Sequence, residues 1–171
     1  MSGLAIRLYA TLPSPAISHR RAQWLTARWY NVAVTAEERD AFLAGPHVAV
    51  LATVDRSGRA HGAPIWYVYD HGVFIMSTGR GSQKHRNVEA NPEVTLVVDQ
   101  RTLPYYAVMA RGPIEIGPPL SHDDRLRIVR RYLDEGQTRR YMQRTAGDDS
   151  VSLRLRPRKL IEFFGRAGRR N

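Results

Sequence analysis

Apolar residues recur along the chain with two different periods, and the change between them separates the predicted elements. Residues 35–44 have helical spacing and begin with a capping box, Thr35 followed three residues later by Glu38. Gly45 and Pro46 end this helix. From His47 onward the apolar residues alternate or form short runs, which is typical of β-strands. The predicted strands cover residues 47–54, 60–69, 73–77, 94–99, 105–116 and 151–156.

Short polar turns at 55–58 and 70–72 join the first strands, so these strands are expected to pair antiparallel in a meander. Pro64 favours an edge position or a bulge for the second strand. An apolar run at 160–164 is expected to continue the last strand. Helical turns are expected over residues 82–90, 121–133 and 138–145. This order favours a mainly β fold, a closed or partly closed antiparallel barrel of about six strands with flanking helices.

The first 34 residues differ from the rest of the chain. They are irregular around Pro13 and Pro15, and a short apolar helix is expected at 22–30 that needs a surface to dock on. We therefore expect an N-terminal extension over 1–34 and one barrel domain over 35–171, a length that suffices for a single core.

The net charge of +10 is concentrated at the two ends of the chain. Residues 1–34 carry a net +4 and residues 151–171 a net +6, so the middle is neutral. A basic nucleic-acid-associated protein is therefore only a less favoured alternative, because such proteins place their charge on a folded face. There is no cysteine, no apolar run as long as a membrane helix and no secretory signal, so we expect a cytoplasmic protein without a membrane partner.

Several familiar catalytic patterns are absent from the sequence. It has no Walker A loop, no Gly-x-Gly-x-x-Gly after a strand, no Gly-x-Ser-x-Gly and no conspicuous carboxylate pair. The histidines show no metal-ligand spacing and are expected on the surface or in turns; they are His19, His47, His61, His71, His85 and His122. We expect neither a metal site nor a catalytic side chain.

One stretch, STGRGSQKHRN at 77–87, has the composition of an anion-binding loop. Gly79 and Gly81 allow backbone N–H groups to approach a ligand closely. The helix expected after Ser82 presents its N-terminus there, and Lys84 supplies a compact charge suited to a phosphate. The alternative is a solvated basic turn between a strand and a helix.

The pattern over 77–94, Ser-Thr-Gly-Arg-Gly-Ser-x-Lys-x-Arg-Asn-Val-x-x-Asn-Pro-x-Val, resembles the pyridoxamine 5′-phosphate oxidase-like split β-barrel superfamily. It is most similar to the flavin- and deazaflavin-dependent oxidoreductases of that superfamily. The hairpin at 48–70 and the segment 104–116 fit the same family, and the resemblance extends over about residues 40–165.

This resemblance implies a homodimeric, six-stranded split β-barrel of the FMN-binding type with cofactor sites at the subunit interface. It places Ser82 and Lys84 on the cofactor phosphate, with Arg86 nearby, although relatives often carry arginine at the position of Ser82. Asn87 would orient the loop or reach a ligand oxygen. The implied cofactor-binding residues are Pro64, Ile65, Trp66, Ser77, Thr78, Gly79, Ser82, Lys84, Arg86, Asn87 and, from the partner subunit, Tyr105 and Tyr106.

The function implied by the resemblance is hydride transfer between a bound cofactor and a small organic substrate. Coenzyme F-420 is slightly preferred over FMN because the Lys-x-Arg-Asn segment at 84–87 looks like the deazaflavin branch. In such enzymes the cofactor carries the reactive chemistry, which fits the lack of a catalytic motif. A non-catalytic protein that binds a flavin or haem-type ligand in the same fold is the main alternative.

Overall fold

A computed structural model of the chain describes residues 34–164. The helix expected at 22–30 and the basic residues beyond 164 lie outside the described residues. Helix α1 (Ala36–Leu43) follows Thr35, whose Oγ1 accepts a hydrogen bond from the N–H of Glu38 at 3.2 Å. The Glu38 carboxylate accepts in turn from the N–H of Thr35 at 3.0 Å, so the capping box predicted from sequence is confirmed.

Residues 34–164 form eight strands rather than about six. They are β1 (Ala49–Val54), β2 (Ala60–Ile65), β3 (Tyr67–Asp70), β4 (Val73–Gly79), β5 (Glu93–Gln100), β6 (Tyr106–Gly117), β7 (Ser150–Leu155) and β8 (Lys159–Phe164). The strand predicted at 60–69 breaks at Trp66 into β2 and β3. The apolar run at 160–164 does not continue β7 but forms a separate strand that pairs with β6. Both differences arise because a long segment changes its pairing partner partway along.

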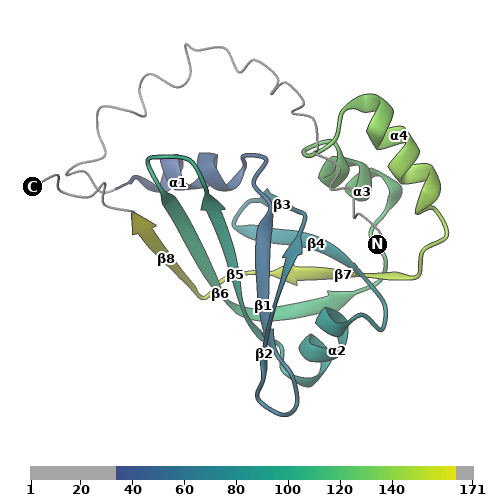
Figure 1. Cartoon of the computed structure of the whole chain (residues 1–171), viewed down its shortest axis with the longest axis horizontal. Coiled ribbons are helices and arrows are strands. Elements are labelled where there is room, and N and C mark those ends of the chain that lie inside the picture. The colour runs from purple at the N-terminus through teal and green to yellow at the C-terminus, as the bar shows by residue number, and fades with distance from the viewer. Residues whose placement is uncertain (1–33, 165–171) are drawn as a thin grey trace, which may run out of the picture. The chain divides into compact units, whose positions relative to one another are not determined.

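The strand order is β2-β1-β5-β6-β7-β4-β3, with β8 beside β6, and every pairing is antiparallel. The two ends of this order, β2 and β3, are consecutive in the chain and separated only by Trp66. The sheet therefore has to curl until its two edge strands are joined through this residue, and Figure 1 shows the curled sheet. The result is the mainly β, antiparallel split barrel expected from the sequence, with Pro64 in an edge strand as predicted.

The expected simple meander is wrong in one respect, because β5 does not pair with β4. Helix α2 (Gln83–Ala90) carries the chain from β4 to the other side of the barrel, where β5 pairs with β1 and β6. Strand β7 takes the place beside β4. The turns in the sequence predict that consecutive strands pair, but they do not show where β5 lies. The connection through α2 decides that position.

Strand β6 is long because two strands, β8 and β7, pair one after the other with the same edge of it. Its first half pairs with β8 and its second half with β7. The connection between these two strands passes over Gly112, where a Cβ atom would lie 3.1 Å from the backbone nitrogen of Arg158. The glycine is therefore required by a close backbone approach.

Alternate residues of the strands point into the curled sheet and form the main core. Its fully buried side chains include Leu43, Leu51, Tyr67, Phe74, Met76, Leu96, Leu153 and Leu155. A second apolar cluster contains Val68, Ile75, Leu120 and Ile128, and Ile128 belongs to helix α3 (His122–Val129). The β3–β4 hairpin thus has apolar side chains on both faces.

Helices α3 and α4 (Glu135–Arg144) lie together beside the β3–β4 hairpin, whereas α2 lies near the ends of β1 and β2 (Figure 1). The helix predicted at 121–133 ends earlier, at Val129, and the one predicted at 138–145 starts earlier, after Asp134. The carboxylate of Asp134 accepts from the N–H of Gln137 at 2.8 Å and forms a second capping box. None of the described helices is long and apolar enough to cross a membrane.

Candidate functional site

The loop between β4 and α2 is a tight turn that places the start of a helix at the end of a strand. Strand β4 ends at Gly79 and α2 begins at Gln83. The N–H of Ser82 donates to the carbonyl of Gly79 at 3.1 Å. Gly81 has a φ of 71°, the left-handed region where glycine is favoured. The strand-to-helix turn expected at 77–87 is thus confirmed.

Ser82 is the N-cap of α2 and belongs to a pair of hydroxyl groups. Its Oγ accepts from the N–H of His85 at 3.3 Å and lies 3.1 Å from the Oγ1 of Thr78. Ser82 therefore caps the start of the helix. The N–H groups of Gln83 and Lys84 have no hydrogen-bond acceptor within residues 34–164. Such free donors at a helix N-terminus favour a negatively charged ligand.

The three cationic side chains of the loop differ in their partners. Arg80 forms an exposed ion pair with Asp149 at 3.0 Å. Arg86 folds back over its own turn and donates to the carbonyl of Gly81 and, at 2.7 Å, to the Oε1 of Gln83. The half-buried Lys84 has no ion pair or hydrogen bond in the described part of the chain. Lys84 is therefore the cation that the loop leaves available, and Arg86 stabilises the turn.

Asn87 is buried and connects α2 to the sheet. Its Nδ2 donates to the Oγ1 of Thr53 at 2.9 Å, and its Oδ1 accepts from the Nε2 of Gln83 at 2.7 Å. Thr53, also buried, donates in turn to the carbonyl of His61 at 3.3 Å. These bonds fix the first turn of α2 on strands β1 and β2.

His85 corrects the expectation that every histidine lies on the surface or in a turn. It is only 5% exposed, and its Nδ1 accepts a hydrogen bond from the N–H of Gly81 at 3.2 Å. Helical spacing gives the reason, because Val88, three residues later, is buried on the same face of α2. His85 thus helps to hold the turn in shape.

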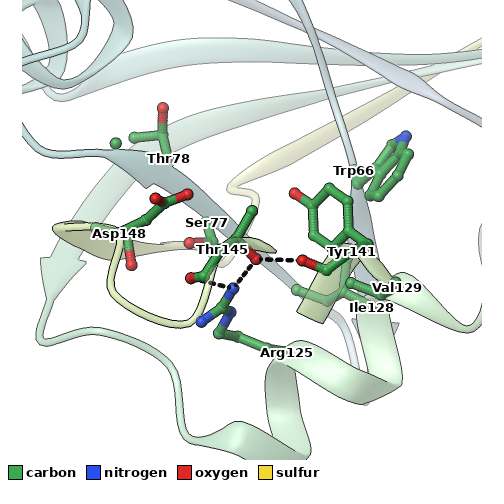
Figure 2. A pocket seen from close by; sticks show the side chains of 11 residues that line it. Trp66, Ser77, Thr78, Arg125, Ile128, Val129, Tyr141, Thr145 and Asp148 are labelled. Atoms are coloured by element: carbon green, nitrogen blue, oxygen red, sulfur yellow. Dashed lines mark hydrogen bonds between the residues drawn. The ribbon is translucent and has the colours of Figure 1, made fainter. Parts of the chain in front are cut away.

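A cavity of about 170 Å³ lies at the end of β4, between this strand and helices α3 and α4 (Figure 2). It contains four of the residues predicted to bind the cofactor: Trp66, Ser77, Thr78 and Gly79. The other lining residues come from 125–150, which the sequence did not connect to the site: Arg125, Ile128, Val129, Tyr141, Thr145, Asp148 and Ser150. Helical apolar spacing in 121–133 indicated a packed face but gave no sign of a cavity.

Trp66 is held in this cavity by stacked aromatic rings. Its ring lies parallel to that of Tyr132, with centroids 4.9 Å apart, and 5.4 Å from that of Tyr141. The Tyr132 hydroxyl accepts from the N–H of Tyr67 at 3.2 Å and donates to the carbonyl of His47 at 3.0 Å. It therefore provides hydrogen-bond partners for backbone groups near Trp66, where the strand breaks. Burial raises the pKa of both Tyr132 and Tyr67.

Arg125 is a half-buried cation in the wall of the cavity. Its Nη2 donates to the carbonyl of Thr145 at 3.0 Å and to the Oγ1 of Thr145 at 2.5 Å. The Thr145 hydroxyl donates to the carbonyl of Tyr141 at 2.9 Å, as the dashed lines in Figure 2 show. The last turn of α4 thus holds the guanidinium in place.

The remaining predicted site residues lie elsewhere in the chain. Pro64 is exposed on β2, and Ile65 is buried in the main core. Tyr106 is buried as well, and its hydroxyl donates to the Oε2 of Glu162 at 2.8 Å. Tyr105 is 48% exposed just before β6. Within one subunit the structure does not bring these residues into the cavity beside β4.

A family model and several solved structures match this chain. A family model described as pyridoxamine 5′-phosphate oxidase matches residues 35–163. Among solved structures, an F420 reductase is 28% identical, with a TM-score of 0.60 over 71% of this chain and 94% of its own. No curated protein sequence matches the chain.

Two further solved structures share the fold at lower identity. A FAD-binding protein from Mesorhizobium loti is 19% identical, with a TM-score of 0.56 over 77% of this chain and 96% of its own. HupZ from Group A Streptococcus is also 19% identical, with a TM-score of 0.53 over 80% of this chain and 100% of its own. At this identity the likeness extends to the fold alone.

Proposed function

The chain belongs to the pyridoxamine 5′-phosphate oxidase family, and we propose that it is a flavin- or deazaflavin-dependent oxidoreductase. It transfers hydride between a bound F-420 or FMN cofactor and a small organic substrate. The observation that carries this proposal is Lys84, a half-buried ammonium without a partner in residues 34–164, on the first turn of α2 beside free backbone donors.

The donor set of the loop fits a phosphate group. The N–H groups of Gln83 and Lys84 and the Lys84 ammonium supply donors to an anion, and an ammonium suits a phosphate as a point charge. Arg86 and Asn87 act indirectly, because Arg86 fixes the turn and Asn87 fixes the helix. In this proposal Lys84 keeps the phosphate contact that the resemblance implies, and Arg86, placed nearby by the resemblance, stabilises the turn.

The end of β4, where the loop begins, fits the ring system of the same cofactor. Ser77, Thr78 and Gly79 form a polar wall that continues directly into the loop, and Trp66 adds an aromatic wall. When bound, the cofactor supplies the hydride chemistry. The chain itself positions the ring, excludes water with its aromatic residues and offers hydroxyl donors near developing charge.

F-420 is the preferred cofactor, and FMN is the alternative. The Lys-x-Arg-Asn segment resembles the deazaflavin branch, and the F420 reductase is 28% identical to this chain, compared with 19% for the FAD-binding protein. We also propose a homodimer with the site near the subunit interface. Tyr105 is then the better candidate for a contact from the partner, because Tyr106 is buried within its own subunit.

Titration with F-420 and FMN, followed by fluorescence quenching, tests the proposal. Replacing Lys84 with alanine is expected to weaken cofactor binding roughly 10- to 100-fold, because a charge-assisted contact to the phosphate is lost. Lys159→Ala is the matched control, since Lys159 is the other lysine of the chain and lies exposed on β8. It is expected to bind the cofactor normally.

Three other outcomes would change the proposal. If the unaltered protein binds neither cofactor, the proposed function is wrong. Unchanged affinity of the Lys84 variant would refute the role of this residue. Cofactor binding without turnover across a substrate panel would favour the non-catalytic alternative.

A further inference from the structure

Arg125 differs from the nearby Arg127 and Arg130 in having no carboxylate partner among the described residues. Arg127 pairs with Asp70 at 3.1 Å and Asp124 at 3.5 Å, and Arg130 pairs with Glu135 at 3.5 Å. Arg125 is more buried than either of them but forms no ion pair with any described residue. A half-buried guanidinium with no carboxylate beside it can bind an anion that enters the cavity.

The hydrogen bonds of Arg125 leave part of its guanidinium available. Its Nη2 is occupied by the two oxygens of Thr145, whereas Nε and Nη1 have no acceptor in the described residues. A guanidinium held at one corner has lost part of its rotational freedom before a ligand arrives. Its remaining donors can bind an oxyanion in the paired geometry that arginine favours.

The rest of the cavity is suited to a flat, apolar body. Trp66 and Tyr141 supply aromatic surface, and Ile128 and Val129 supply aliphatic surface. A volume of about 170 Å³ is below that of a typical drug-sized site and suits a molecule with one ring. Asp148 also lines the cavity but is exposed, and it forms no ion pair with Arg125.

We propose that this cavity binds a small planar molecule that carries a carboxylate, with the carboxylate on Arg125 and the ring beside Trp66 and Tyr141. A single arginine, with Asp148 in the same wall, suits a monoanion better than a phosphate dianion. Since Ser77, Thr78 and Gly79 line both this cavity and the proposed ring site, the ligand is the substrate of the proposed oxidoreductase. The identification as substrate rests on the proposed function, but the binding site does not.

Calorimetric titration of the full chain with benzoate, benzamide and phenyl phosphate tests the site without any cofactor. Benzoate is expected to bind at least about tenfold more tightly than benzamide, because only benzoate carries the charge that Arg125 recognises. Phenyl phosphate is expected to bind more weakly than benzoate. Equal binding of benzoate and benzamide, or no binding of benzoate, would overturn the proposal. Tighter binding of phenyl phosphate would overturn the carboxylate preference.

Two variants and one control test whether the benzoate carboxylate binds at Arg125. Arg125→Gln is expected to lower benzoate affinity roughly 10- to 100-fold and to leave benzamide unchanged. Asp148→Asn should tighten benzoate binding severalfold by removing a like charge. Arg130→Gln, an exposed position at the end of the same helix, should bind benzoate as the unaltered chain does. Benzoate affinity unchanged in Arg125→Gln would place the carboxylate elsewhere.

The same titration separates this inference from the proposed function. Lys84 does not line the cavity, so Lys84→Ala should retain benzoate binding while it loses the cofactor. Benzoate bound by a protein that binds no cofactor would support the cavity and refute the oxidoreductase. Circular dichroism checks the fold of each variant; if Arg125→Gln does not fold, the comparison of benzoate with benzamide on the unaltered chain decides.

Discussion

The loop between β4 and α2 and the aromatic cavity beside it share a wall but are built from different interactions. The loop comprises residues 77–87 and is held mainly by hydrogen bonds between near neighbours, such as Gly81 with His85 and Arg86 with Gln83. The cavity takes its walls from three separate parts of the chain, Trp66, the end of β4 and residues 125–150. Its shape depends on ring stacking and helix packing between distant residues.

This difference indicates two separate tasks that meet at Ser77, Thr78 and Gly79. In our proposals, the loop supplies an anion site through Lys84, whose ligand is a cofactor phosphate. The cavity supplies an aromatic site with one arginine, whose ligand is a substrate carboxylate. Variants in one region are therefore expected to leave the ligand of the other region bound.

The largest effect is expected at Asn87, the buried side chain that links α2 to strand β1. Asn87→Ala leaves Thr53 and the Nε2 of Gln83 without their partner and should lower the free energy of unfolding by about 2 kcal/mol. Urea denaturation measures this loss. Cofactor affinity should fall with it because α2 is no longer fixed, whereas benzoate affinity should stay unchanged. Asn91→Ala, at the exposed end of the same helix, is the control, and equal losses in both variants would contradict the role of Asn87.

A smaller effect is expected in the aromatic region. Tyr132→Phe keeps the ring that stacks on Trp66 but removes the hydroxyl that forms hydrogen bonds with the backbone of Tyr67 and His47. It should cost about 1 kcal/mol of stability in urea and leave cofactor binding intact. Tyr141→Phe is the matched control, since the Tyr141 hydroxyl forms no hydrogen bond with the described residues. A Tyr132 variant as stable as this control would show that the strand break needs no hydroxyl.

The smallest effect is a change in the pH dependence of stability. Burial raises the pKa of Tyr132 above its usual value near 10, so above this pH the unfolded chain loses a proton that the folded chain keeps. Because the unfolded state then binds fewer protons, stability falls as pH rises. Tyr132→Phe removes this group, and its stability should fall less steeply between about pH 9 and about pH 11. Parallel curves of urea midpoint against pH for the two proteins would contradict the expectation.

Much of the loop could be predicted from the sequence because its interactions are local. The run STGRGSQKHRN specifies a strand end, a glycine turn and a capped helix within eleven residues, and the structure confirms all three. The role of Arg86 could not be predicted. Lys84 and Arg86 are both cations on one short helix, and only the fold shows that Arg86 binds its own turn.

The sequence by itself determined the antiparallel barrel class, the capping box at Thr35 and the position of the anion-type loop. These features depend on residue period and on contacts a few positions apart. Only the tertiary structure decided where the strands break, which strand lies beside β4 and which helix residues meet Trp66. Tyr132 contacts the backbone of Tyr67, 65 residues away, and Arg125 reaches Thr145, 20 residues away. Such contacts exist only after the sheet has curled and α3 and α4 have packed on it, so no local pattern in the sequence records them.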